Sequence, residues 1–287
     1  MATFETSLKS RLIYVFAIPD EWHKDCLKVG ETTLEEDDGN FPLPNSEVLN
    51  KAACDRIDQY TKTAGIAYNL LHTEMTVFFK GGTISSFNDK QVHSVLERSG
   101  VKKKTFDTVK GANEWFCCDL ETVKKAIHAV KNGRNSLNAS DISYTQTPII
   151  FRPEQQAAID KTKKQFKKGA QMLWNAKMRF GKTLCALRVA RDLEMRRTII
   201  LTHRPVVDES WFEDFGKIFY DRTDYHYGSR TKGEDFTSLE RLAKKGDRYV
   251  YFASMQDMRG AQLVGGKFDK NNEVFSTDWD FLIVDEA

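Results

Sequence analysis

Residues 176–183 read Ala-Lys-Met-Arg-Phe-Gly-Lys-Thr, and the segments on both sides of this stretch indicate the fold around it. The preceding segment, Gln171–Ala176, is typical of a short apolar strand, and Leu184–Met195 carries apolar residues at helical spacing. The stretch therefore joins a strand to a helix. Because free backbone N–H groups and the helix dipole favour an anion at such a junction, the sequence predicts a phosphate site here.

Four residues of this loop have the chemistry that a nucleoside triphosphate needs. Gly181 lets the backbone approach a phosphate without a Cβ clash, Lys182 reaches the β and γ phosphates, and the Thr183 hydroxyl is a ligand for Mg²⁺. Ala176 stands where the strict P-loop pattern has glycine, and its small side chain serves the same turn. A chance Gly-Lys-Thr at a helix start is the alternative interpretation.

An acidic pair follows about 100 residues further along the chain. The segment 280–284 reads Asp-Phe-Leu-Ile-Val, a short apolar strand, and Asp285 and Glu286 come directly after it. In a nucleotide-hydrolysing domain, the first carboxylate of such a pair holds Mg²⁺ and the second orients the attacking water. The sequence therefore assigns Asp285 to the metal and Glu286 to catalysis.

From about Phe151 onward, predicted strands alternate with predicted helices. The strands expected after the loop are Thr198–Thr202, Arg248–Ser254 and Trp279–Val284, and Val206–Phe219 is an amphipathic helix. This alternation predicts an α/β domain with a parallel sheet and helices on both faces. Because a buried strand normally leads into a covering helix, we expect the chain to be the N-terminal fragment of a longer protein, with its sheet incomplete at the C-terminus.

Residues 150–287 resemble the first RecA-like lobe of superfamily-two helicases and translocases, especially those of restriction and phage-defence systems. Beyond the loop and the acidic pair, three short elements carry the resemblance: Phe-Arg-Pro-Glu-Gln-Gln at 151–156, Thr-His-Arg-Pro at 202–205 and Ala-Ser-Met-Gln at 253–256. Asp-Glu-Ala at 285–287 is similar to the start of a "DEAH"-type box.

The resemblance implies an ATP- and Mg²⁺-dependent motor lobe acting on DNA, most simply duplex DNA. It implies that Gln155 reads adenine, with Arg152 nearby, and that residues at the strand ends contact the DNA backbone: Thr202, His203, Arg204 and Gln256. Strand ends at one edge of a parallel sheet are where ligands bind, although a solvated turn is the alternative for these residues.

The same resemblance implies a partner within the same chain, a second helicase lobe beyond Ala287. In such proteins that lobe supplies the arginine that stabilises the transferring phosphate. We therefore expect the present chain by itself to bind ATP weakly and to hydrolyse it negligibly.

The first half of the chain is predicted to be a small α+β domain. The expected extended segments are Leu12–Ile18, Leu27–Gly30, Ala67–Phe79 and Glu114–Cys117, and the expected helices are Val48–Thr63, Lys90–Arg98 and Leu120–Lys131. A polar stretch follows. We place the first domain at residues 1–131, a linker at 132–149 and the second domain at 150–287.

Short motifs from about Leu12 to Val130 resemble the GIY-YIG nuclease superfamily, in particular the branch found in phage and bacterial proteins under the T5 open-reading-frame name. The motifs are Arg-Leu-Ile-Tyr-Val at 11–15, Leu-Lys-Val-Gly-Glu-Thr-Thr at 27–33, Arg56, Asp-Lys-Gln-Val-His at 89–93 and Glu-Trp-Phe at 114–116. Their order and spacing, more than any one of them, carry the resemblance.

The resemblance implies a metal-dependent endonuclease in which Tyr14 acts on the attacking water and Arg56 stabilises the phosphate charge. The helix expected to carry a metal-binding carboxylate offers several candidates, Asp89, His93 and Glu97, and Glu114 is a further one. Lys28 stands where the superfamily has its second tyrosine. A module that binds DNA without cleaving it is therefore the open alternative.

Composition and charge set the outer limits of these interpretations. The chain has 287 residues, 40% of them hydrophobic, and a net charge of +2, which suits two modest globular cores and no strong overall field. No apolar run is long enough to span a bilayer, and residues 1–11 lack a signal-peptide pattern, so we expect a cytoplasmic protein. Five cysteines without a CxxC pair are expected to be reduced, mostly buried thiols.

Two functions remain open at this stage. The first is a DNA-processing enzyme of a restriction or anti-phage system, in which an ATP-driven translocase delivers a tethered nuclease. The second is a nucleic-acid-binding remodeller whose first domain only recognises DNA. A P-loop kinase or small GTPase is disfavoured, because the acidic pair, the Gln155 element and the Thr-His-Arg strand end fit a motor lobe better.

Overall fold

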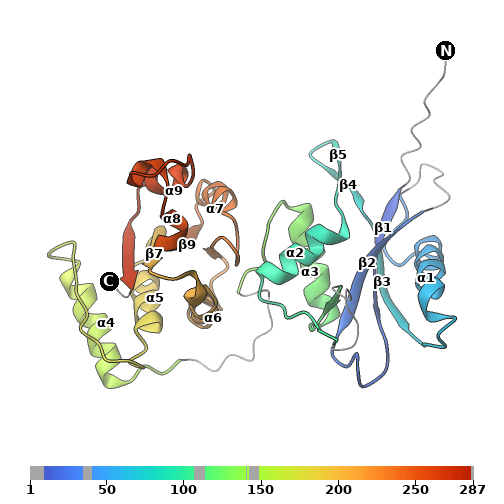
Figure 1. Ribbon diagram of the computed structural model, residues 1–287, viewed down its shortest axis with the longest axis horizontal. Helices are drawn as coiled ribbons and strands as arrows, with labels where there is room; N and C mark the ends of the chain where they lie inside the picture. Colours follow the sequence, from blue (N-terminus) through green and yellow to red (C-terminus); the bar gives the residue numbers. More distant parts are fainter. Residues whose placement is uncertain (1–9, 35–40, 107–113, 140, 142–148, 286–287) are drawn as a thin grey trace, which may run out of the picture. The chain divides into compact units, whose positions relative to one another are not determined.

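The computed structural model describes residues 10–34, 41–106, 114–139, 141 and 149–285 (Figure 1). The chain forms two compact units, Met1–Arg134 and Asn135–Ala287, each with its own sheet and its own apolar core. In the part of the chain so described, no helix is long and apolar enough to cross a membrane.

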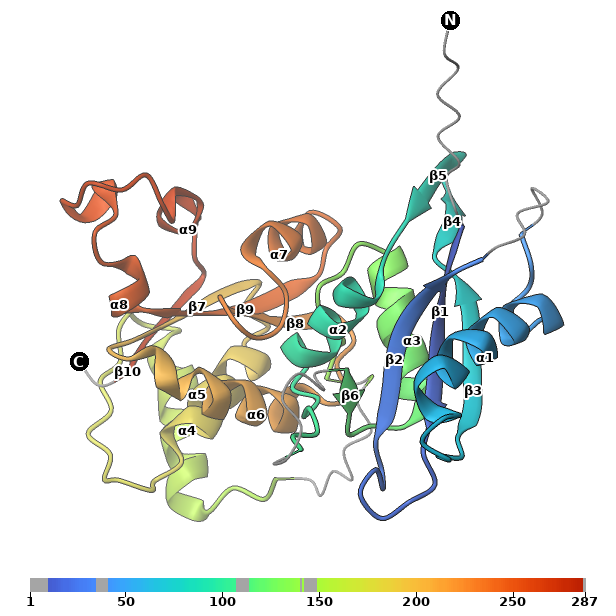
Figure 2. The ribbon, with the colours of Figure 1, turned by 45° about the vertical axis from the view of Figure 1, so that its right-hand side comes forward.

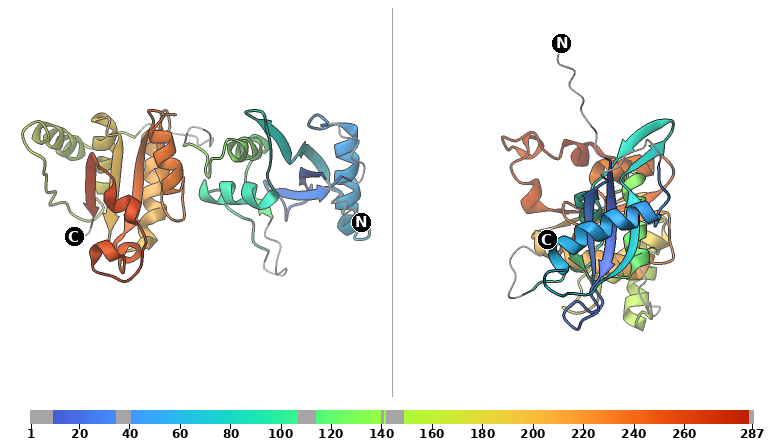
Figure 3. Two further views of the ribbon diagram at one scale, coloured as in Figure 1. Left: turned by 90° about the horizontal axis from the view of Figure 1, so that it is seen from above. Right: turned by 90° about the vertical axis from the view of Figure 1, so that its right-hand side faces the viewer.

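The first unit is built on a four-stranded antiparallel sheet with the order β3-β1-β2-β6. Its strands are β1 (Arg11–Ala17), β2 (Leu27–Thr33), β3 (Asn69–Met75) and β6 (Trp115–Phe116), and a separate hairpin is formed by β4 (Val77–Lys80) and β5 (Thr83–Ser86). Helix α1 (Glu47–Thr61) lies on one face of the sheet, and α2 (Asp89–Arg98) and α3 (Leu120–Lys131) lie on the other (Figures 1 and 3).

The central strand β1 is apolar at almost every position because helices cover both faces of the sheet. Successive side chains of a strand point to opposite faces, so Leu12, Tyr14 and Phe16 pack toward α1. They meet residues that recur every four positions along that helix: Leu49, Ala53 and Ile57. The two faces of the sheet are therefore chemically separate, and any side chain belongs to one or the other.

The second unit has a four-stranded parallel sheet with the order β10-β7-β9-β8. Its strands are β7 (Arg197–Thr202), β8 (Tyr225–Gly228), β9 (Arg248–Ser254) and β10 (Phe281–Asp285). Its α-helices are α4 (Pro153–Gln165), α5 (Lys182–Asp192), α6 (Asp208–Phe219), α7 (Phe236–Ala243), α8 (Met255–Met258) and α9 (Asn272–Ser276), with short 3-10 turns at Pro205–Val207 and Gln262–Val264.

Figure 2 shows α4, α5 and α6 below this sheet and α7 and α9 above it. The prediction of an α+β domain followed by an α/β domain with a covered parallel sheet is confirmed at this level. β9 occupies the predicted range, and β7 begins one residue earlier than predicted. Strand β8 and helices α7 and α9 were not predicted, because their short segments show too few periods of an apolar pattern.

One predicted element is wrong. The segment Gln171–Ala176 is not a strand, and its residues are alternately exposed and half-buried. A strand needs a partner for its backbone groups, and none of the described strands pairs with this segment. The apolar pattern of a segment does not show whether a partner strand lies beside it.

Part of the predicted linker packs onto the second unit. The backbone N–H groups of Asn135 and Ser136 donate to the buried carboxylate of Glu234 at 2.8 and 3.2 Å, and the Asn138 side chain donates to the Thr223 carbonyl at 3.2 Å. Residues 140 and 142–148 of the predicted linker lie outside the described residues.

An ion-pair network fastens the outer edge of the parallel sheet. Asp224, just before β8, accepts two hydrogen bonds from Arg222 at 2.8 and 2.9 Å and one from Arg248 of β9 at 2.6 Å. The Arg222 guanidinium, with help from Arg248, lowers the pKa of the Asp224 carboxyl to about 2. This carboxylate is therefore more acidic in the folded protein than in the unfolded chain, where its pKa is close to 4.

We predict that Asp224→Asn lowers the free energy of unfolding at pH 7 by about 1 kcal/mol, allowing for solvent screening of this partly exposed group. The difference in free energy of unfolding between the two proteins is complete above pH 4 and disappears as the pH falls toward 2. Protonation of Asp224 then removes the charge that pairs with Arg222 and Arg248 in the folded state. Urea unfolding of both proteins between pH 7 and pH 3 measures this. The exposed Asp278, changed to Asn, is the control, and a constant Asp224→Asn difference across this range would contradict the prediction.

Candidate functional site

Tyr14 crosses from β1 over Gly30 of β2, its partner in the strand register. A Cβ placed on residue 30 would lie 2.7 Å from the Cζ and hydroxyl oxygen of the Tyr14 ring, closer than real Cβ contacts allow. Glycine is therefore required at this position by the close approach of a ring, and its own backbone conformation is ordinary. The ring is buried, with its hydroxyl directed toward α1 residues.

The Tyr14 hydroxyl lies close to two side chains of α1, Arg56 and Tyr60. Burial raises the pKa of Tyr14, and the neighbouring Tyr60 hydroxyl and Arg56 guanidinium act in the opposite direction. Burial and the neighbouring Tyr14 hydroxyl raise the pKa of Tyr60 well above its ordinary value. Both phenols therefore keep their protons at neutral pH, and the Tyr14 oxygen lies beside a second phenol and a guanidinium.

Two more charged side chains complete this group, which we call the Tyr14 cluster (Tyr14, Lys28, Arg56, Tyr60 and Glu114). The Lys28 ammonium lies 4.4 Å from the centre of the Tyr60 ring and 3.4 Å from the Glu114 carboxylate. The charge of Glu114 raises the pKa of both phenols, which places it close to them. The cluster thus combines two cations, one carboxylate and a phenol oxygen on one face of the sheet.

A groove of about 660 Å³ opens beside Arg56, between the end of β2 and α1. Its charged lining residues are of both signs: Arg11, Glu31, Glu47, Lys51, Asp55 and Arg56. Arg56 is exposed and also donates to Gln59 at 2.7 Å. The guanidinium therefore stands between the groove and the Tyr14 oxygen, where it can meet a phosphate that enters from solvent.

The Tyr14 cluster offers a divalent cation few protein ligands. No group of three or more His, Cys, Asp or Glu side chains that could hold a metal occurs among the described residues. Mg²⁺ commonly keeps several waters and takes one or two carboxylates together with substrate phosphate oxygens. Glu114, with its half-exposed carboxylate, provides one such ligand beside Tyr14.

The structure does not bring the helical metal candidates to the Tyr14 cluster. His93 is buried on the opposite face of the sheet, where its Nε2 lies 2.8 Å from the Val29 carbonyl and its ring contacts Phe116. Asp89 begins α2 on that same side, and Glu97 pairs with Lys103 at 2.6 Å. Because α1 and α2 cover different faces, Asp89 and His93 cannot share a substrate atom with Tyr14.

Sequence reasoning missed Tyr60, left Lys28 without a role, and named Glu114 only as one of several candidate metal ligands. The signal for Tyr60 was present, because it follows Arg56 by four residues and such residues lie on one face of a helix. The contact between Lys28 and Glu114 joins residues far apart in the sequence through the pairing of β2 with β6. No local pattern could have predicted that pairing.

In the second unit, the predicted phosphate loop ends as the sequence indicates. Gly181 has a left-handed backbone, with φ of 87°, and α5 begins at Lys182 without a side-chain cap. The first N–H groups of α5 are therefore available to an anion, and the helix dipole favours one. Thr183 lies in this first turn, and Ala176 lines a groove between the loop and α4.

The side chains of Arg152 and Gln155 fasten this loop to α4. Both donate to the carbonyl of Phe180, at 2.9 and 2.6 Å, and the Gln155 oxygen accepts from the Arg152 N–H at 2.8 Å. Gly181 is necessary here as well, because a Cβ on it would lie 2.6 Å from the Gln155 amide nitrogen. Gln155 thus positions the loop in this structure, and its predicted contact with adenine stays a prediction.

The predicted strand-end residues meet at one edge of the parallel sheet. The register pairs Asp285 of β10 with Thr202 of β7, and Thr202 with Ser254 of β9. Thr202 donates to the Arg204 carbonyl at 2.9 Å and so shapes the turn that carries His203 and Arg204. The remaining predicted contacts, His203 and Gln256, are exposed beside this edge, and Glu286 lies outside the described residues.

Comparison with known proteins bears on this second unit. Residues 148–287 match the family model "Type III restriction enzyme, res subunit". The chain is also 29% identical over 143 residues to a protein of Mycoplasma pneumoniae described as the C-terminus of a proposed type II restriction enzyme and methyltransferase. That match covers 47% of this chain and 19% of the relative. The second unit is therefore similar to the res-subunit domain of restriction enzymes.

We predict that Gly30→Ala displaces the Tyr14 ring and lowers the free energy of unfolding by about 1–3 kcal/mol, because an added methyl group overpacks this crossing. In a Tyr14→Ala background the same change should cost much less, since the ring is then absent. Denaturant unfolding of the two single variants and the double variant measures this coupling. Additive costs would show that residue 30 is sensitive for a reason other than Tyr14.

We predict that Lys182→Ala weakens the binding of ATP with Mg²⁺ at least tenfold, because it removes the ammonium that reaches the phosphates. Fluorescent ATP-analogue titration at low salt measures the affinity. Lys244→Ala, a change just after α7 on the same unit, is the control and should bind like wild type. Equal affinities of all three proteins would show that this loop does not bind the nucleotide.

Proposed function

We propose that this protein is a DNA-processing enzyme of a restriction or phage-defence system. Its second unit acts as an ATP- and Mg²⁺-dependent helicase-type motor lobe, and its first unit is a GIY-YIG-like, metal-dependent endonuclease. The observation that carries the nuclease assignment is the Tyr14 cluster, in which the Tyr14 phenol lies close to Arg56 and Tyr60 beside Lys28 and Glu114.

Each member of the Tyr14 cluster has a role in hydrolysing a phosphodiester. The Tyr14 oxygen accepts a hydrogen bond from the attacking water and so orients it toward the phosphorus atom, while the phenol keeps its own proton because its pKa is raised. Arg56, at the mouth of the groove, stabilises the negative charge on the phosphate, and Lys28 adds a second cation. Glu114 would hold the divalent cation, which supplies Lewis-acid stabilisation when bound.

The motor assignment rests on the loop at 181–183 and the sheet edge. The free amides of α5, with Lys182 and Thr183, suit the phosphates and Mg²⁺ of ATP, and Asp285 at the end of β10 would face the metal. The exposed residues of the adjoining turns would contact DNA phosphates: His203, Arg204 and Gln256. Thr202, predicted as a fourth contact, is buried and supports this turn through its bond to the Arg204 carbonyl. A nuclease tethered to such a motor meets DNA at a high effective concentration.

A specific observation favours the second candidate function, a recognition module that binds DNA without cutting it. Lys28 occupies the position of the superfamily's second tyrosine, and its ammonium pairs with Glu114 at 3.4 Å. An ammonium at this distance competes with a metal ion for the carboxylate. In this alternative the cations of the Tyr14 cluster bind phosphate, and the second unit acts as an ATP-gated remodeller.

We predict that the protein nicks supercoiled plasmid with Mg²⁺ or Mn²⁺, and that Arg56→Ala and Tyr14→Phe each reduce the rate at least a hundredfold, because they remove the phosphate cation and the hydroxyl that orients the attacking water. Lys90→Ala is the matched control, since Lys90 is exposed on α2 at the opposite face of the sheet. Gel assays of nicked and linear plasmid over time give the rates.

The same preparations should be tested for DNA binding by gel shift. Intact plasmid with a DNA shift that Arg56→Ala weakens would replace the nuclease with the recognition module. Cleavage that survives in both variants would show that the Tyr14 cluster is not its catalytic centre.

A further inference from the structure

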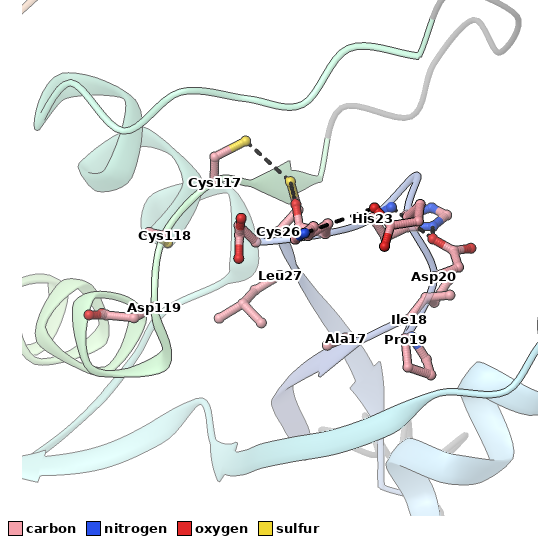
Figure 4. A pocket seen from close by; sticks show the side chains of 13 residues that line it. Ala17, Ile18, Pro19, Asp20, His23, Cys26, Leu27, Cys117, Cys118 and Asp119 are labelled. Atoms are coloured by element: carbon pink, nitrogen blue, oxygen red, sulfur yellow. Dashed lines mark hydrogen bonds and ion pairs between the residues drawn. The ribbon is translucent and has the colours of Figure 1, made fainter.

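Cys26 and Cys117 lie directly opposite each other at the end of the β2–β6 ladder. The register pairs Leu27 with Phe116 and Lys28 with Trp115, so the next pair along the strands is Cys26 with Cys117. The two sulfur atoms are 3.2 Å apart, in contact but not bonded (Figure 4). Their approach is therefore built into the pairing of the strands.

The backbone around the pair has the geometry that a disulfide requires. The Val29 N–H donates to the Glu114 carbonyl at 3.1 Å, whereas the Cys117 N–H points away from β2 and donates to the Lys102 carbonyl at 2.8 Å. By the alternation of an antiparallel ladder, Cys26 and Cys117 thus form a non-hydrogen-bonded pair. In such pairs the Cα atoms are only about 4.5 Å apart, within the range that disulfides span.

The two thiols differ in their access to solvent. Cys117 is exposed, whereas Cys26 is 3% exposed, and its thiol donates to the Lys24 carbonyl at 3.3 Å. Burial, together with the neighbouring Cys117 sulfur, raises the pKa of Cys26 to about 11. A small oxidant therefore meets Cys117 first, and Cys26 is held behind it as a second thiol within reach.

We propose that Cys26 and Cys117 are a site of reversible oxidation by hydrogen peroxide, which closes a disulfide between β2 and β6. The Cys117 sulfur attacks a peroxide oxygen, the O–O bond breaks, and water leaves with the thiol proton, giving a sulfenic acid. The Cys26 sulfur then attacks the Cys117 sulfur, an S–S bond forms, and the hydroxyl group leaves as a second water with the Cys26 proton. Two thiols and one peroxide thus give one disulfide and two waters, and a dithiol reductant reverses the reaction.

The disulfide would secure the shortest strand of the sheet. β6 has two residues and lies at the sheet edge, and the new bond would join positions 91 residues apart in sequence. A cross-link over so long a stretch restricts the unfolded chain strongly. The same strand follows Glu114, so oxidation would also hold this carboxylate beside Lys28. That last consequence rests on the proposed function, whereas bond formation does not.

The test uses the whole chain, reduced and desalted, then treated with a small excess of hydrogen peroxide and quenched with N-ethylmaleimide. Peptide mass spectrometry should find the 26–117 cross-link, formed within one molecule and lost after dithiothreitol. Cys117→Ser removes an exposed thiol and should abolish the cross-link without unfolding the protein. Cys118→Ser, in the adjoining position of the same pocket, is the matched control and should leave the cross-link unchanged.

A second measurement follows folding stability and needs no enzymatic activity. Oxidation should raise the Tm of the first unit of the wild-type protein by at least about 5 °C and leave that of Cys117→Ser unchanged. Sulfinic acid at Cys117 without a cross-link, a bond from Cys26 to Cys118, or bonds only between molecules would each overturn the proposal. Because these readouts do not involve DNA cleavage, failure of the nuclease assignment would not change them.

Discussion

The crossing of Tyr14 over Gly30 is the constraint on which the rest of the first unit's site depends. A ring can lie across the neighbouring strand only where that strand carries no side chain, and this places the Tyr14 oxygen where α1 can reach it. Arg56 and Tyr60, one helical turn apart, then converge on a single oxygen. The result is a polar group assembled at the rim of an apolar core, with charges that the core itself could not hold.

In the second unit, the polar groups of the candidate site come from the backbone in place of side chains. Gly181 turns the chain into α5 and leaves the first amides of that helix uncapped, while Arg152 and Gln155 hold the preceding carbonyl. The donors that an anion would meet at this loop are organised in advance, because the helix fixes the backbone amides and α4 fixes the loop. The match of residues 148–287 to the res-subunit family concerns this unit alone.

The first unit also shows how a sheet separates groups of residues between its two faces. In the first unit, α1 brings the Tyr14 cluster to one face, while His93 is an internal hydrogen-bonding residue on the other. The β2–β6 pairing serves two features at once, because it brings Glu114 to Lys28 and Cys117 to Cys26. A change in the short strand β6 would therefore affect both the proposed site and the thiol pair.

The sequence by itself determined the elements with strong local signals. Periodicity located α3, β7 and β9, and the Gly-Lys-Thr triplet marked the start of α5, because these features depend on neighbours within a few residues. Only the tertiary structure decided which faces the elements share. It separated His93 from Tyr14, added Tyr60 to the site, placed the candidate Glu114 beside Tyr14, and left Gln171–Ala176 without a strand partner. Strand pairing and the choice of sheet face join residues far apart in the chain, so no local pattern encodes them.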